Sequence, residues 1–227
     1  MFGKTRALEY FVISMFCQAG CGRLGFDSAD AALSFAQLCD FESHVIIENG
    51  IAIDDDAGLR LSEAVKVGCE STITRRMVSQ DDASAVDADT GRPLVLPNEL
   101  IVLGGGDGPH HVVRYLLEMD TPLVWSGSAP VTIIERATNR VIARGPTNSS
   151  NDYILLQVVM EPISGTIAFS GQGLTGNGTS ASALYFEQVI SPRIADENTS
   201  WIVVQWTDSD GTIGASENDT YTVIESG

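Results

Sequence analysis

Two glycine-rich turns and an aspartate triplet hold the residue types best suited to chemistry in this chain. Residues 101–110, IVLGGGDGPH, pass from an apolar run through glycines into an amphipathic segment, and residues 170–180, SGQGLTGNGTS, also lead from a strand into a helix. Backbone N–H groups at a turn from a strand into a helix can bind anions such as phosphates. The carboxylates of residues 54–56, DDD, can instead bind cations or transfer protons.

These three segments predict one crevice. In a doubly wound sheet they lie together at the carboxyl edge of the strands, where such folds bind ligands. There the carboxylates could hold a divalent cation, or act as acid, base or metal ligand in an exported hydrolase. The alternative is that they are solvated residues of a helix start, where acidic side chains complement the helix dipole. The predicted crevice residues are Gly104, Gly105, Gly106, Asp107, Gly171, Gly173, Asp54, Asp55 and Asp56.

The first turn does not match a nucleotide-binding motif. The dinucleotide pattern needs a third glycine, but Pro109 stands at that place after Gly104 and Gly106. The loop also lacks the Lys-Ser/Thr ending of a P-loop, and Asp107 would oppose an anion. We therefore expect no nucleotide and interpret the segment as a tight turn between a strand and a helix.

The acidic turn WTDSDGTIGASE partly matches a calcium-binding loop. When Gly211 is placed on the invariant glycine, Asp208, Asp210 and Glu217 fall on the third, fifth and twelfth positions. Trp206 falls on the first position and cannot coordinate a hard cation. A hairpin turn is therefore the favoured interpretation, with calcium binding as the alternative.

No residue set suited to zinc binding or nucleophilic catalysis is evident in the sequence. His110 and His111 are adjacent at a helix start, so their side chains diverge, and we expect surface or capping residues. The chain has no Gly-x-Ser-x-Gly elbow, and Lys4 and Lys66 are its two lysines. We expect no catalytic residues and no cofactor, a divalent cation being the one alternative.

Strands and helices alternate along the chain. Apolar runs such as HVIIENG (residues 44–50) and ELIVLGGG (residues 99–106) predict strands buried on both faces. Their alternation with amphipathic segments predicts an α/β fold with a mostly parallel sheet. Segments 131–144 and 201–225 are typical of hairpins and predict an antiparallel extension or edge. We expect a single three-layer α/β/α domain over residues 41–227.

The N-terminus has the pattern of an export signal. Residues 1–9 carry Lys4 and Arg6, whereas residues 10–20, YFVISMFCQAG, carry no charge. A basic start, an apolar run too short to span a bilayer and a small-residue exit are typical of a secretory signal peptide. The exit QAGC, ending at Cys21, resembles the lipobox of bacterial lipoproteins, and CGRLGFD resembles the first residues of many lipoproteins predicted in Deltaproteobacteria.

The lipoprotein resemblance implies an anchor and a location. Residues 1–20 would be removed, Cys21 would be lipidated, and residues 21–40 would form a tether or a short helix. Diacylation plus N-acylation of Cys21 would supply more than the two signals that stable membrane attachment requires. Gly22 after the acceptor implies the outer membrane, with the domain in the periplasm or on the surface. The alternative is a buried helix with two incidental cysteines.

The composition excludes several partners. The chain of 227 residues carries 13 basic and 30 acidic residues, and removal of residues 1–20 leaves 11 and 29, a net charge of −18. Such a surface repels phosphate backbones and anionic headgroups, so we expect no nucleic acid as a partner.

Cys39 and Cys69 could form a disulfide. Export would place them in an oxidising compartment, where their thiols can oxidise. The geometry would permit the bridge, because a helix that packs back across a parallel sheet returns to the edge where its strand began. Two buried free thiols are the alternative.

With these elements in order, residues 44–190 resemble the α/β domain of surface-layer-type envelope proteins. The matching pieces are HVIIENG, NELIVLGGG, VVRYLLEM, VTIIERATNRVIARG, YILLQVVMEP and TIAFSGQGLTGNGTSASALYF. The resemblance implies a structural role at the cell surface. We therefore expect an exported, lipid-anchored envelope protein with a structural or interaction role, whose partners are other envelope proteins or glycans. The alternatives are an exported hydrolase and a solute- or glycan-binding lipoprotein that uses the glycine-turn crevice.

Overall fold

The computed structural model describes most of the chain beyond its N-terminal segment. The described residues are 33–106, 108, 110–119, 121–126, 130–145, 147–212 and 214–227. Contacts divide the chain into the units Met1–Ala31 and Ala32–Gly227, and all described residues belong to the second. The expected signal peptide, Cys21 and Asp107 lie outside the described residues.

A mixed sheet of seven strands forms the centre of this unit, so the α/β class is confirmed. Four neighbouring strands at one end are mutually parallel, and the remaining three pair antiparallel. In sheet order the strands are β10 (Thr220–Ser226), β9 (Trp201–Thr207), β7 (Asn151–Met160), β8 (Ile167–Gly173), β3 (Leu100–Gly104), β1 (Ser43–Glu48) and β2 (Thr74–Ser79).

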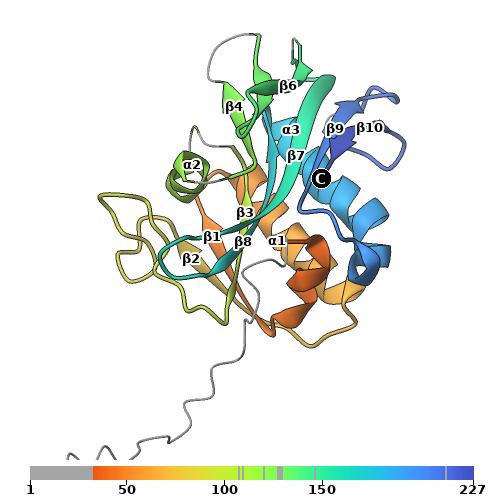
Figure 1. The fold of residues 1–227 in the computed structure, drawn as a ribbon. Helices are drawn as coiled ribbons and strands as arrows, with labels where there is room; N and C mark the ends of the chain where they lie inside the picture. Colours follow the sequence, from red (N-terminus) through yellow and green to blue (C-terminus); the bar gives the residue numbers. More distant parts are fainter. Residues whose placement is uncertain are drawn as a thin grey trace, which may run out of the picture. The chain divides into compact units, whose positions relative to one another are not determined.

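Alternation of side chains along the strands divides the core between the two faces of this sheet. On one face, Ile46 and Val102 pack with α1 (Ala52–Gly68) and α3 (Gly176–Tyr185). On the other face, Val45 and Ile101 pack with α2 (His111–Glu118), which Figure 1 shows across the sheet from α1 and α3. The predicted buried strands β1 and β3 are therefore covered on both faces by apolar residues of other elements.

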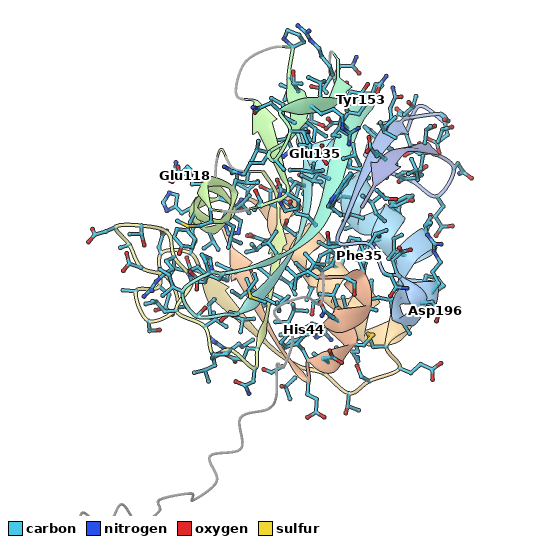
Figure 2. The ribbon with its side chains drawn as sticks, in the orientation of Figure 1. Phe35, His44, Glu118, Glu135, Tyr153 and Asp196 are labelled. Carbon is cyan, nitrogen blue, oxygen red and sulfur yellow. A yellow bond between two sulfur atoms is a disulfide. The ribbon has the colours of Figure 1, made fainter. Side chains whose placement is uncertain are left out.

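Short helical turns complete the face that α1 and α3 cover. They are η1 (Phe35–Asp40), η2 (Phe186–Ile190) and η3 (Ser191–Asp196). Phe35 of η1 is fully buried, and its ring centroid lies 5.8 Å from that of Phe169 and 6.0 Å from that of Phe186. Figure 2 shows Phe35 inside the unit, whereas Asp196 lies on its surface. The core therefore includes residues that precede the expected domain start at residue 41.

The hairpin of residues 131–144 does not extend the large sheet. Instead β5 (Thr132–Glu135) and β6 (Arg140–Arg144) join β4 (Leu123–Ser126) in a separate three-stranded antiparallel sheet. Its apolar residues Leu123, Ile133 and Ala143 pack on β7 and β9, which explains why it lies over the large sheet and not at its edge. The second predicted hairpin, β9 and β10, does form an edge of the large sheet.

Cys39 and Cys69 form a disulfide. The bridge ties η1 to the end of α1 across a separation of 30 residues, and in the chain-entropy model a loop of that length contributes about 3–4 kcal/mol. No helix among the described residues combines the length and the apolar character needed to cross a membrane.

Candidate functional site

A cavity of about 330 Å³ lies at the carboxyl edge of the parallel strands, where the sequence predicts a crevice. Three segments line most of it. The start of α1 contributes Ile51, Ile53 and Asp54, the turn into α3 contributes Gly173 to Gly176, and Trp125 comes from β4. The first turns of two helices therefore meet the small sheet at one cavity.

Three of the nine predicted crevice residues line this cavity, namely Asp54, Gly106 and Gly173. Gly104 and Gly105 lie against α1 instead. A Cβ atom at Gly104 would lie 2.1 Å from the carbonyl oxygen of Asp54, and one at Gly105 would lie 2.5 Å from the Asp54 carboxyl. These two glycines allow the turn to pack directly on the helix start, which is a steric role.

The remaining predicted residues lie elsewhere. Gly171 is buried beneath α3, where a Cβ atom would lie 2.7 Å from the hydroxyl of Ser182. Asp55 Oδ1 accepts a hydrogen bond from the backbone N–H of Asn49 at 2.9 Å, which fixes the turn between β1 and α1. Asp56 is exposed and outside the cavity lining, and Asp107 lies outside the described residues.

Among the described residues, Asp54 is the carboxylate that lines the cavity. It is 5% exposed, and its Oδ2 accepts a hydrogen bond from Asn49 Nδ2 at 2.8 Å. Burial raises the pKa of Asp54 above its ordinary value, while hydrogen bonds from Asn49 and the Thr179 hydroxyl oppose that rise. Asp54 is thus a positioned acceptor and not a solvated residue of the helix start.

Trp125 is a site residue that the sequence did not reveal. Its indole Nε1 donates to Gln172 Oε1 at 2.9 Å, and Gln172 Nε2 in turn lies 2.8 Å from the Ser170 hydroxyl that accepts from it. This chain fixes the ring at the cavity wall. Trp125 lies in a short strand of the separate sheet, so no local pattern connects it to the glycine turns. The tryptophan beside a Ser-Gly-Ser segment is the one signal that could have drawn attention to it.

Asp152 supports the turn that leads into α3. It is fully buried on β7, and its Oδ2 accepts from the backbone N–H and from the hydroxyl of Thr175, both at 2.8 Å. Burial raises the pKa of Asp152 to about 6, although the bonds from Thr175 favour the ionised form. Because Thr175 lines the cavity and caps α3, Asp152 positions one of the cavity walls.

The acidic turn after β9 brings together a different set of residues from the predicted one. Asp208 and Asp210 lie close to Asp219, with one oxygen of each within 4.8 Å of the others, whereas Glu217 is exposed and outside the cluster. Hydrogen bonds from Thr212 and Ser216 lower the pKa of Asp210 to about 2.

These carboxylates also organise the turn itself. Asp208 accepts from the backbone N–H of Gly211, and Asp219 accepts from the buried Trp206 indole at 2.9 Å. The hydrogen bonds agree with the interpretation of this segment as a hairpin turn.

One of the paired histidines is not at the surface. His110 is fully buried, and its Nε2 lies 3.0 Å from the carbonyl oxygen of Ile47, while its side chain makes no capping bond to α2. His111 is exposed. Burial lowers the pKa of His110 to about 4, so it stays neutral at ordinary pH. The apolar residues around α2 explain the difference from the predicted surface position.

Within the described part of the chain, the cavity lining holds one ionisable side chain, that of Asp54. The other lining groups are threonine hydroxyls, glycine backbone, the indole of Trp125 and aliphatic side chains. A lone buried carboxylate with hydroxyl and apolar neighbours can orient a bound molecule through hydrogen bonds.

No protein-family model matches this chain, and no curated protein matches it.

Proposed function

We propose that this chain is an exported, lipid-anchored protein of the bacterial outer membrane whose α/β domain serves an interaction role. Support for export comes from the basic and apolar pattern of residues 1–20 and from Cys21 at a lipobox-like exit. The disulfide between Cys39 and Cys69 agrees with it, because such bridges persist in oxidising compartments.

The cavity at the carboxyl edge is the observation that carries the interaction role. It has the size of a small-molecule site, and Asp54 and Trp125 line it in positions fixed by hydrogen bonds. A buried carboxylate that is the one ionisable side chain among the described lining residues is suited to holding a ligand. The crevice is therefore a binding site, and its ligand is a solute or part of an envelope component.

The resemblance to surface-layer-type envelope proteins, which implies a structural role, supports a location at the cell surface. We infer a three-layer α/β/α arrangement, supported by the packing of Val45 and Ile46 against helices on opposite faces of the sheet. The strongly acidic composition keeps such a domain soluble outside the cell and discourages contact with anionic lipids beyond the anchor.

Metabolic labelling with a palmitate analogue tests the anchor. We expect the wild-type chain to incorporate the label and Cys21→Ala to lose it, because the thiol of Cys21 is the acceptor. Cys17→Ala is the matched control and should be labelled like wild type, since Cys17 would leave with the signal. Equal labelling of Cys21→Ala and wild type would contradict the proposal.

A further inference from the structure

We propose that the crevice between the starts of α1 and α3 binds an uncharged saccharide. This inference rests on the proposed interaction role and specifies its ligand. It is drawn from the chemical groups that line the cavity, from the fixed indole of Trp125, and from the cavity volume of about 330 Å³.

The charge pattern at the cavity selects a neutral ligand. Among the described lining residues, no lysine, arginine or histidine is available to pair with an anion, and the chain as a whole carries a net charge of −17. The starts of two helices, with their partial positive charge, line the same space and disfavour a cation. The Asp54 carboxylate already lies in the first turn of α1, where it complements the positive end of the helix dipole.

The polar groups suit ligand hydroxyls, because a hydroxyl both donates and accepts hydrogen bonds. Asp54 is an acceptor at the cavity wall, and the hydroxyls of Thr175 and Thr179, which donate their protons to Asp152 and Asp54, can still accept from a ligand. The helix starts supply backbone N–H donors, and Ile51 makes no side-chain capping bond at the start of α1. A molecule with several adjacent hydroxyls can satisfy this mixed set.

An apolar wall complements the other side of a sugar ring. Trp125 lines the cavity with its indole held by Gln172, and Ile51 and Ile53 are 41% and 36% exposed at the same cavity. Sugar rings present C–H faces that pack on aromatic and aliphatic surfaces, burying apolar area. A rigid ring loses little conformational entropy on binding.

The volume limits the ligand to a small saccharide. Small-molecule sites range over roughly 300–1,000 Å³, and the cavity of about 330 Å³ lies at the low end of that range. One or two sugar residues fit this space, either as a free sugar or as part of a longer glycan chain.

Titration of the full-length protein tests the ligand class, with tryptophan fluorescence and saturation-transfer NMR as readouts. The neutral probes are glucose, N-acetylglucosamine, cellobiose and maltose; the charged probes are glucosamine, glucuronate and inorganic phosphate. We expect at least one neutral sugar to bind with a Kd of about 1 mM or tighter and the charged probes to bind at least about tenfold more weakly.

Two variants connect that binding to the crevice. Gly108 also lines the cavity, and a Cβ atom there would meet nothing within 4 Å, so Gly108→Leu should fold and narrow the cavity, abolishing binding. Trp125→Ala should weaken binding about tenfold through the loss of stacking, whereas Ile163→Ala removes a 68% exposed side chain outside the cavity lining and should change nothing.

The source of the saccharide is distinguished by comparing maltose with maltotetraose. Tighter binding of the tetrasaccharide assigns the crevice to a glycan chain, equal binding assigns it to a free sugar, and both results support the saccharide class.

Three results would overturn the inference. They are an absence of binding by every neutral probe at about 10 mM, unchanged binding in Gly108→Leu, and a preference for glucuronate or phosphate. Charged-probe binding that Gly108→Leu abolishes would refute the saccharide while leaving the interaction role in place. Loss of the proposed anchor would instead appear as equal palmitate labelling in Cys21→Ala, independently of any sugar titration.

Discussion

Asp54 and Asp152 are buried carboxylates with different roles at the crevice: Asp54 lines the cavity, and Asp152 positions a residue of its wall. Asp54 lines the cavity, and its carboxyl accepts hydrogen bonds from Asn49 and Thr179. Asp152 is fully buried and holds Thr175 through two hydrogen bonds. A buried ionised carboxylate is costly unless its partners compensate for the lost hydration, and for both residues burial raises the pKa. The crevice is therefore maintained at some cost in stability at neutral pH.

Asp152→Asn should reduce the pH dependence of stability. Between about pH 4, the unfolded value, and about pH 6, the folded chain holds a proton on Asp152 that the unfolded chain has released. The free energy of unfolding therefore falls as pH rises through this window, by up to about 3 kcal/mol. Asp152→Asn has no titrating carboxyl at this position, so its free energy of unfolding should not fall in this way. Urea unfolding at about pH 4 and about pH 7 measures the difference.

Asp196→Asn is the matched control for that measurement, because Asp196 is exposed and its replacement should leave the wild-type pH profile unchanged. The same loss of stability between the two pH values in Asp152→Asn and wild type would show that Asp152 does not carry the proton.

Some of the crevice residues could be predicted from the sequence and others could not. Asp54, Gly106 and Gly173 follow from the rule that strand-to-helix turns meet at the carboxyl edge of a parallel sheet. Trp125 could not be predicted, because its position depends on how the small sheet packs on β7 and β9. Sequence also could not separate glycines that line a cavity from Gly104 and Gly105, which pack against α1.

Close packing of β8 against the start of α3 is the main element-level constraint on the crevice. A Cβ atom at Gly173 would lie 2.2 Å from the carbonyl carbon of Gly178 and 2.4 Å from the backbone nitrogen of Thr179. A Cβ atom at Gly178 would lie 2.0 Å from Asp152 Oδ2. The strand, helix and buried carboxylate thus fit together only with glycine at these two positions.

Gly173→Ala should destabilise the protein by at least about 2 kcal/mol, because the new methyl group meets backbone that cannot rotate away. Gly108→Ala adds the same methyl group into open space and should stay within about 0.5 kcal/mol of wild type. Chemical denaturation of the two variants side by side makes the comparison. Equal stability of both would mean that the contact between β8 and α3 is looser than the structure indicates.

At the level of helices and strands, the predicted strands correspond closely to the observed ones. Long apolar runs such as residues 44–48 and 100–104 are buried on both faces. The prediction for residues 131–144 was wrong in one respect. Local pattern identified the hairpin, but its separation into a second sheet depends on Leu123 and Ile133 packing over the large sheet. Such long-range packing leaves no local signal.

For the molecule as a whole, the proposed export signal, the disulfide and the acidic composition agree with one location outside the cytosol. The Cys39–Cys69 bridge closes a loop of chain that contains β1 and α1, and Asp54 lies in the first turn of α1. The bridge therefore constrains the segment that forms one side of the crevice. Residues 1–20 and Cys21 supply the prediction that this unit matures outside the cytosol.

Whether the chain is exported and lipidated can be measured by intact-mass spectrometry of the protein from the cells that make it, with free thiols alkylated before lysis. We expect a chain that begins at an acylated Cys21 and in which Cys39 and Cys69 take up no alkylating reagent. A mass that includes Met1 and four alkylated cysteines would contradict it, because it would show a full-length, reduced chain that was never exported.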